Sequence, residues 1–242
     1  MSVDAESPQA YAATLSIVVA LSALSLLPVF MIKEQPRPAA EQARSLLPWR
    51  NISHLGLAVG IFVPNIIISM GAAILIPYMN LFFKDTCAVS DKTLGGLFAV
   101  SSVVTGLATL ASPVLADRWG RIRALVMTEL ASIPFLLIIG FAPALWMASL
   151  AFWARAALMN MGNPLYNAFA MEQFSERERA TVSGLMGMSW NIGWTIGPFL
   201  SGYMQAGVGF PPIFAITCSF YVVAVILEKL FFQRMDDRQI RA

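Results

Sequence analysis

Charged residues are scarce in this sequence. Lys, Arg, Asp and Glu make up 12% of its 242 residues, 57% are hydrophobic, and the mean hydropathy is +0.68. A water-soluble domain keeps about a quarter of its residues charged, because its surface must face water. The shortage of charge therefore excludes an ordinary soluble globule and indicates that lipid is the main solvent of the chain.

Cysteine and histidine are also rare. The two cysteines, Cys87 and Cys218, are too few and too far apart for a disulfide framework or a metal knuckle. The single histidine, His54, has no companion at ligand spacing, so we expect no metal and no cofactor. A net charge of +2, with no basic tract carrying interleaved aromatics, argues against nucleic acid as a partner.

Long apolar stretches are abundant. About 20 apolar residues in a helix cross a hydrocarbon core of about 30 Å, and lipid leaves unpaired backbone groups no partner. The stretches are far longer than the roughly 10-residue alternating strands of a membrane barrel. We therefore predict an all-α integral membrane protein whose partner is the lipid bilayer, with seven transmembrane helices at 12–32, 56–83, 93–116, 124–141, 145–170, 180–206 and 211–232.

Basic residues are sorted to one side of these predicted helices. Of the 16 Lys and Arg residues, 13 fall in segments 33–54, 117–123 and 172–179 or in the tail from Lys229, whereas the alternate segments hold only Lys84 and Lys92. Basic loops stay in the cytoplasm. We therefore expect a multi-pass cell-membrane protein with its N-terminus outside and its C-terminus in the cytoplasm.

One long connection divides the chain. Segment 33–54 contains three prolines and mixed charges, whereas the later connections are short and force successive helices to lie antiparallel. We expect an outer tail at 1–10, a first transmembrane helix at 11–32, a cytoplasmic linker at 33–54, a six-helix bundle at 55–233 and a cytoplasmic tail at 234–242.

Two motifs mark the loop between the third and fourth predicted helices and the sixth predicted helix. The loop carries Asp117, Arg118, Gly120, Arg121 and Arg123. It resembles the inner-loop motif of the major facilitator superfamily, although Pro113 stands where the pattern of that family has glycine. The sixth helix is similar to the antiporter motif of that family, with Ser201 in place of one glycine, and its helix-packing residues are Gly193, Gly197, Pro198 and Gly202.

This resemblance implies a fold and a function. The chain resembles the sixth helix, the central linker and the C-terminal six-helix half of such a transporter, so the six helices should form a major-facilitator-like half-bundle. It implies secondary transport of a small-molecule substrate by alternating access, with an antiporter as one mode, and a loop motif that latches the inner side closed. Helices equivalent to the first five of such a transporter are absent from this sequence. We therefore expect either that the chain is a truncated product, or that it pairs with a separate N-terminal half or with a second copy of itself.

Polar residues within the predicted helices are candidates for a substrate or coupling pathway, because charge at membrane depth is costly. Arg155 lies near the middle of the fifth predicted helix, about 16 Å from its outer end at a rise of 1.5 Å per residue. It is predicted either to bind an anionic group or to make a structural ion pair. The other candidates are Asn160, Asn163, Tyr166, Asn167, Asn65 and Asn191.

Two acidic residues receive structural interpretations. Glu129 lies five residues into the fourth predicted helix, about 7 Å from the inner edge, where we expect a structural pairing. Glu228 and Lys229 are expected only to mark the inner end of the last helix.

Other functional classes remain open. A heptahelical receptor or retinal protein would share the topology, but Lys229 is too close to the inner end for a Schiff base. A half-bundle that does not transport, as a fragment or interaction partner, is the main alternative. The predicted helices contain no Ser/His, paired-Asp or His-rich constellation, so we do not expect an enzyme.

The sidedness leads to a direct test. A small tag at Lys84 should react with a membrane-impermeant reagent on intact cells, and a tag at Arg121 should react only after the cells are opened. Equal reactivity of both tags from outside would contradict the topology.

Overall fold

The computed structural model describes residues 8–27 and 55–240, which fall into two units that are described separately. In the first unit, α1 (Pro8–Leu24) is a helix whose apolar part, Ala12–Leu24, is shorter than a full membrane crossing. The expected end of the first transmembrane helix and the whole linker at 33–54 lie outside the described residues. The other helices that the structure describes belong to the second unit.

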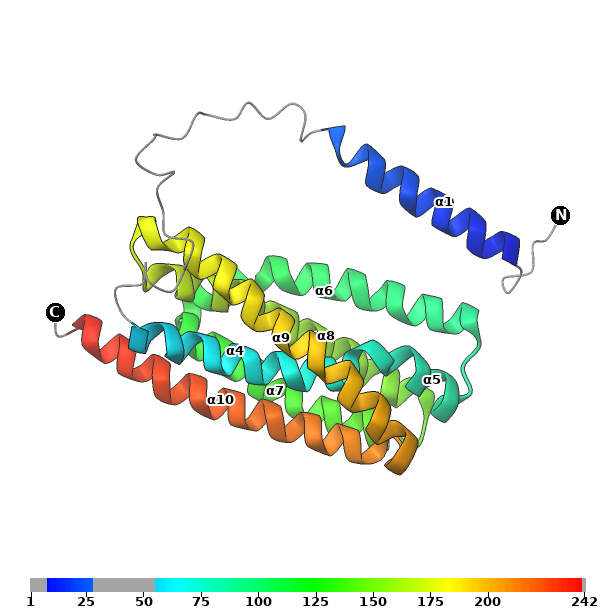
Figure 1. Cartoon of the computed structure of the whole chain (residues 1–242). Helices are drawn as coiled ribbons and strands as arrows, with labels where there is room; N and C mark the ends of the chain where they lie inside the picture. Colours follow the sequence, from blue (N-terminus) through cyan, green and yellow to red (C-terminus); the bar gives the residue numbers. More distant parts are fainter. Residues whose placement is uncertain (1–7, 28–54, 241–242) are drawn as a thin grey trace. The chain divides into compact units, whose positions relative to one another are not determined.

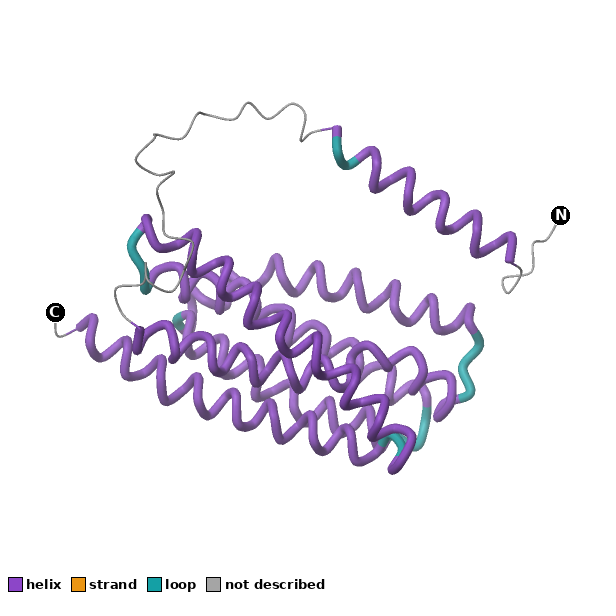
Figure 2. Tube along the Cα trace, in the orientation of Figure 1, coloured by secondary structure: helices purple, strands orange, loops and turns teal. Residues whose placement is uncertain are grey.

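Every regular element of the second unit is helical (Figures 1 and 2). The helices are α4 (Leu55–Leu75), η2 (Ile76–Tyr78), α5 (Met79–Cys87), α6 (Asp91–Trp119), α7 (Arg121–Phe141), α8 (Leu145–Glu172), α9 (Glu176–Val208) and α10 (Pro211–Ile240). The helices α4, η2 and α5 follow one another without a gap and read as one apolar span, Gly56–Cys87. The predicted all-helical six-helix bundle is thus confirmed.

Local sequence explains where the helices begin and end. Ser90 begins α6 and its Oγ accepts a hydrogen bond from the backbone N–H of Thr93 at 3.3 Å. Ser175 and Glu178 form a capping box at the start of α9, and such caps satisfy backbone donors that a helix start leaves unpaired. Gly120 separates α6 from α7 with a φ of +80°, a conformation that suits glycine because it lacks a Cβ.

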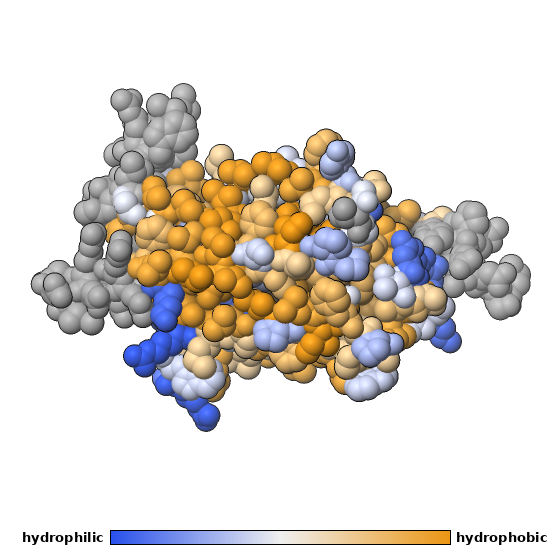
Figure 3. Space-filling view, turned by 90° about the horizontal axis from the view of Figure 1, so that it is seen from below, coloured by the Kyte–Doolittle hydropathy of each residue, from blue (hydrophilic) through white to orange (hydrophobic). Residues whose placement is uncertain are grey.

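The outer surface of the bundle is apolar. Four stretches are long and apolar enough to cross a membrane, Gly56–Cys87, Asp91–Trp119, Arg121–Phe141 and Pro211–Phe232, whereas α8 and α9 carry more polar residues along their length. Large hydrophobic side chains such as Leu107, Leu110 and Phe199 are exposed. One face of the molecule is mainly hydrophobic across its middle, with hydrophilic residues toward its ends, as expected where lipid is the solvent (Figure 3).

The helices pack as two close pairs joined by α10. The helix α4 packs along α9, and α7 packs along α8, while α10 lies against both α4 and α7. The helix α6 packs mainly on α8. Because α8 and α9 contact each other only slightly, the bundle has an open seam between them.

Small residues allow α4 and α9 to approach closely. A Cβ placed on Gly193 would lie 2.6 Å from the backbone N of Met70, and one on Gly197 would lie 2.5 Å from the Cβ of Ala73. The other end of the pair is tied by Tyr78, whose hydroxyl donates to the carbonyl of Pro198 at 2.8 Å. The structure thus places Gly193, Gly197 and Pro198 on the α4 side of α9, and Gly202 next to the Tyr78 hydroxyl.

Filling this contact should destabilise the bundle. The variant Gly197→Ala should lose about 1–3 kcal/mol of stability, because the added methyl group meets backbone that cannot move aside. Thermal unfolding in detergent, followed by tryptophan fluorescence, measures the change. Gly184→Ala on the same helix is the control, since a Cβ there meets nothing within 4 Å and alanine favours helix by about 1 kcal/mol. Equal melting temperatures for the two variants would refute close packing at Gly197.

Candidate functional site

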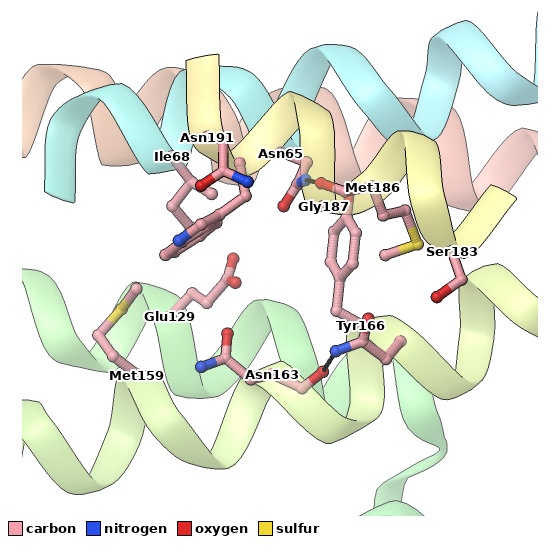
Figure 4. A pocket seen from close by; sticks show the side chains of 12 residues that line it. Asn65, Ile68, Glu129, Met159, Asn163, Tyr166, Ser183, Met186, Gly187 and Asn191 are labelled. Carbon is pink, nitrogen blue, oxygen red and sulfur yellow. Dashed lines mark hydrogen bonds between the residues drawn. The ribbon is translucent and has the colours of Figure 1, made fainter. Parts of the chain in front are cut away.

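A cavity of about 510 Å³ occupies the seam between α8 and α9 (Figure 4). Helix α4 contributes two lining residues, α7 one, α8 four and α9 five. They are Asn65, Ile68, Glu129, Met159, Asn163, Tyr166, Asn167, Ser183, Met186, Gly187, Trp190 and Asn191. The wall therefore combines amide, hydroxyl and carboxyl groups with thioether and aromatic surface.

The mouth of the cavity is polar. Asn163 and Asn167 of α8 and Asn191 of α9 are all exposed. Asn167 donates to the carbonyl of Asn163 at 2.9 Å, one helical turn earlier, and retains its side-chain oxygen as an acceptor. Each amide group can both donate and accept, so this wall can bind a solute without requiring one charge.

Asn65 ties the base of the cavity to α9. It is buried, and its Nδ2 donates to the Oγ of Ser189 at 2.5 Å and to the carbonyl of Met186 at 3.2 Å. Tyr166 makes a similar tie from α8, because its hydroxyl donates to the carbonyl of Ile61 in α4. These three bonds satisfy polar groups that would otherwise be buried without partners. They tie α8 and α9 to α4 beside the cavity.

Glu129 forms the remaining part of the base. Its side chain is only 5% exposed, yet its carboxylate points into the space between α8 and α9 (Figure 4). Its Oε2 accepts no hydrogen bond from the described residues. Behind it lies Glu228 of α10, which is fully buried and within hydrogen-bonding reach of the Glu129 carboxyl group.

Arg155 lies away from the cavity wall. It is buried, its Nη2 donates to the hydroxyl of Tyr221 at 2.7 Å, and its guanidinium carbon lies 5.5 Å from the centre of the Tyr221 ring. No carboxylate among the described residues forms an ion pair with it. Hydrogen bonding and cation–π contact with one tyrosine thus take the place of the acidic partner that a buried arginine usually has.

The structure brings together five of the seven predicted pathway residues. Asn65, Asn163, Tyr166, Asn167 and Asn191 line one cavity. Asn160 is half-buried beside it, where its Nδ2 donates to the carbonyl of Ala156. Arg155 points toward Tyr221 of α10 instead. Residues that share one face of a helix but lie at different depths in the membrane contact different neighbouring helices.

Sequence reasoning missed the two acidic residues. Glu129 was expected near the interface in a structural pairing, but it lies buried at the base of the cavity. Glu228 was expected only to mark the inner end of the last helix, but it lies within α10 and is completely buried. The signal was present, because both carboxyl groups lie within long apolar stretches, where charge is costly.

The inner-loop motif is separate from this cavity. Gly120 forms the turn, and Arg121 forms an ion pair with Glu172 at the end of α8. Together with Arg123 these residues border a second hollow of about 420 Å³. Asp117, Arg118 and Arg123 are exposed and have no ion-pair partner within the ranges that the structure describes.

Both the sequence and the fold of this chain are similar to those of known proteins. The family model of the Major Facilitator Superfamily matches residues 61–240. Multidrug resistance protein MdtG of Proteus mirabilis is 25% identical over 167 residues, which are 66% of this chain and 41% of that protein. Protein ZINC INDUCED FACILITATOR-LIKE 1 of Arabidopsis thaliana is 24% identical over 147 residues, 58% of this chain and 30% of that protein.

Solved structures share the fold. The transporter FucP in its outward conformation matches with a TM-score of 0.65 and 14% identity, over 89% of this chain and 53% of that one. A second structure, of the E. coli fucose:proton symporter FucP, matches with a TM-score of 0.68, over 94% of this chain and 59% of the other. This chain thus spans about two fifths of the length of the MdtG relative and little more than half of these structures.

The Arg155–Tyr221 contact can be tested by stability. Tyr221→Phe keeps a ring beside the guanidinium but removes the hydrogen bond to a buried charge, so we expect a loss of about 1.5–3 kcal/mol. Thermal unfolding in detergent measures it. Tyr203→Phe is the matched control because Tyr203 is 81% exposed, and an equally small effect in both variants would show that the bond contributes nothing.

Proposed function

Because this chain belongs to the major facilitator superfamily, we propose that it carries a small organic solute across the membrane by alternating access. The observation that supports this most directly is the cavity between α8 and α9. Its volume of about 510 Å³ lies within the range of about 300–1,000 Å³ that is usual for small-molecule sites. We propose that it forms one side of the substrate site.

The lining residues suggest the class of solute. Asn163, Asn167 and Asn191 offer amide donors and acceptors, Trp190 and Met186 offer polarisable apolar surface, and Glu129 offers a carboxyl group. Thioether and aromatic side chains adapt to ligands of different shapes. We therefore propose an amphipathic solute, neutral or cationic, and the name of the MdtG relatives, multidrug resistance protein, agrees with such a solute.

Alternating access needs a second set of helices that faces the cavity. We propose that another part of a longer protein or a second copy of this chain supplies it. The exposed Asp117, Arg118 and Arg123 support this pairing, because they lie at the end of the bundle where the inner-loop motif would bind a facing helix. The N-terminus lies outside and the C-terminus in the cytoplasm in this proposal.

Uptake by purified protein in proteoliposomes tests the proposal, with a fluorescent amphipathic cation such as ethidium as the probe. Uptake by the 242-residue chain alone would identify a second copy as the facing bundle, and uptake only by a longer gene product would identify that product's other helices. If neither takes up a range of amphipathic probes, the proposal fails, and a half-bundle that does not transport is the correct reading.

The cavity has its own test. Asn163→Ala or Asn191→Ala should raise the half-saturating solute concentration about five- to tenfold, because each removes a hydrogen bond of about 1 kcal/mol or slightly more. Asn80→Ala is the matched control, since Asn80 is an exposed amide outside the cavity lining. Unchanged half-saturation in both cavity variants would place the substrate elsewhere.

A further inference from the structure

The carboxyl groups of Glu129 and Glu228 face each other inside the bundle. Glu129 comes from α7 and Glu228 from α10, and the two helices pack side by side. The side chains are 5% and 0% exposed, and their carboxyl groups lie within hydrogen-bonding reach of each other. The pair, called the Glu129–Glu228 dyad below, is buried on the α10 side and reaches the cavity only through Glu129.

No basic group among the described residues forms an ion pair with the dyad. Arg155 of α8 donates to Tyr221, and Lys229 is exposed although it follows Glu228 in sequence. Among the residues that the structure describes, the other titratable groups that interact electrostatically with the dyad are the phenols of Tyr166 on α8 and Tyr221 on α10. Helix α4 contains no charged residue, and the charged residues of α6 and α9 lie near the helix ends.

The carboxyl oxygens are also short of donors. Glu129 Oε2 and both Glu228 oxygens accept no hydrogen bond from an N–H or O–H group of the described residues. Two ionised carboxylates in contact would repel strongly in so poorly polar a setting, and each would lack the bonds that stabilise a buried charge. Contact between the two groups is favourable only when a proton lies between them, as in other paired carboxyl groups.

We propose that the Glu129–Glu228 dyad is an exchangeable proton site that opens to the cavity through Glu129. With two protons the dyad is neutral. It releases one proton from Glu129 to a water molecule in the cavity, and the remaining proton is shared between the two carboxyl groups, which together then carry one negative charge. Glu228 acts through Glu129 and is a positioning residue.

The dyad also has a consequence for transport that rests on the proposed function. When it has released its proton, its negative charge lies at the base of the cavity and attracts a cationic solute. When it has bound the proton again, that attraction ends. Proton and solute would then compete for one site, which is the requirement for exchange of one for the other.

Infrared difference spectroscopy tests the proton site without any transport. The full chain in lipid nanodiscs should show a protonated-carboxyl carbonyl band at neutral pH, where exposed carboxyl groups are ionised, and this band should disappear in base and move in heavy water. The double variant Glu129→Gln, Glu228→Gln should lose this band, and Glu176→Gln should retain it, because Glu176 is an exposed glutamate at the start of α9. A wild-type protein without the band, or a double variant that keeps it, would overturn the proposal.

Solute accumulation in proteoliposomes tests the coupling. If one proton is exchanged per solute, a gradient of one pH unit should raise accumulation about tenfold, and Glu228→Gln should abolish this dependence on the gradient although it does not line the cavity. Accumulation by Glu228→Gln that still follows the gradient would overturn the coupling role. Absence of uptake by the wild-type chain would refute the proposed function instead, and the infrared result would then decide the proton site alone.

Discussion

Lipid gives a polar group nothing to bond with, and most of this structure follows from that constraint. Helices satisfy the backbone, so the side chains that remain polar must find one another inside the bundle. They do so in separate contacts: Asn65 with Ser189, Tyr166 with the Ile61 carbonyl, Arg155 with Tyr221, and Glu129 with Glu228. The contact between the two carboxyl groups differs from the others, because it is favourable only when a proton lies between them.

The fold was predictable because this constraint acts on composition. Long apolar stretches and short connections are enough to predict a helical membrane bundle, and the motif from Asp117 to Arg123 points to the family. Much of the cavity was also predictable, because amides such as Asn163 and Asn191 are rare in apolar helices without a reason. The register of neighbouring helices was not, since one sequence does not state which residue of α10 meets which residue of α7.

That missing register explains why the contact between the two acidic residues was not predicted. Glu129 and Glu228 are 99 positions apart in the sequence, and only the packing of α7 on α10 brings them together. Glu228 lies inside the apolar stretch Pro211–Phe232, and hydropathy alone does not state which helix covers it. Arg155 was predicted to lie on the cavity side but does not line the cavity. Helical periodicity places it on the same face as Asn163, but its long side chain reaches Tyr221 of α10.

Helix α10 connects the two closely packed helix pairs of the bundle. Close contacts at glycine residues hold α4 against α9, and α7 packs closely along α8. Helix α10 packs against one helix of each pair, α4 and α7. The contact between Glu129 and Glu228 lies where α10 packs on α7. The two pairs are therefore held together mainly through α10, since α8 and α9 contact each other only slightly.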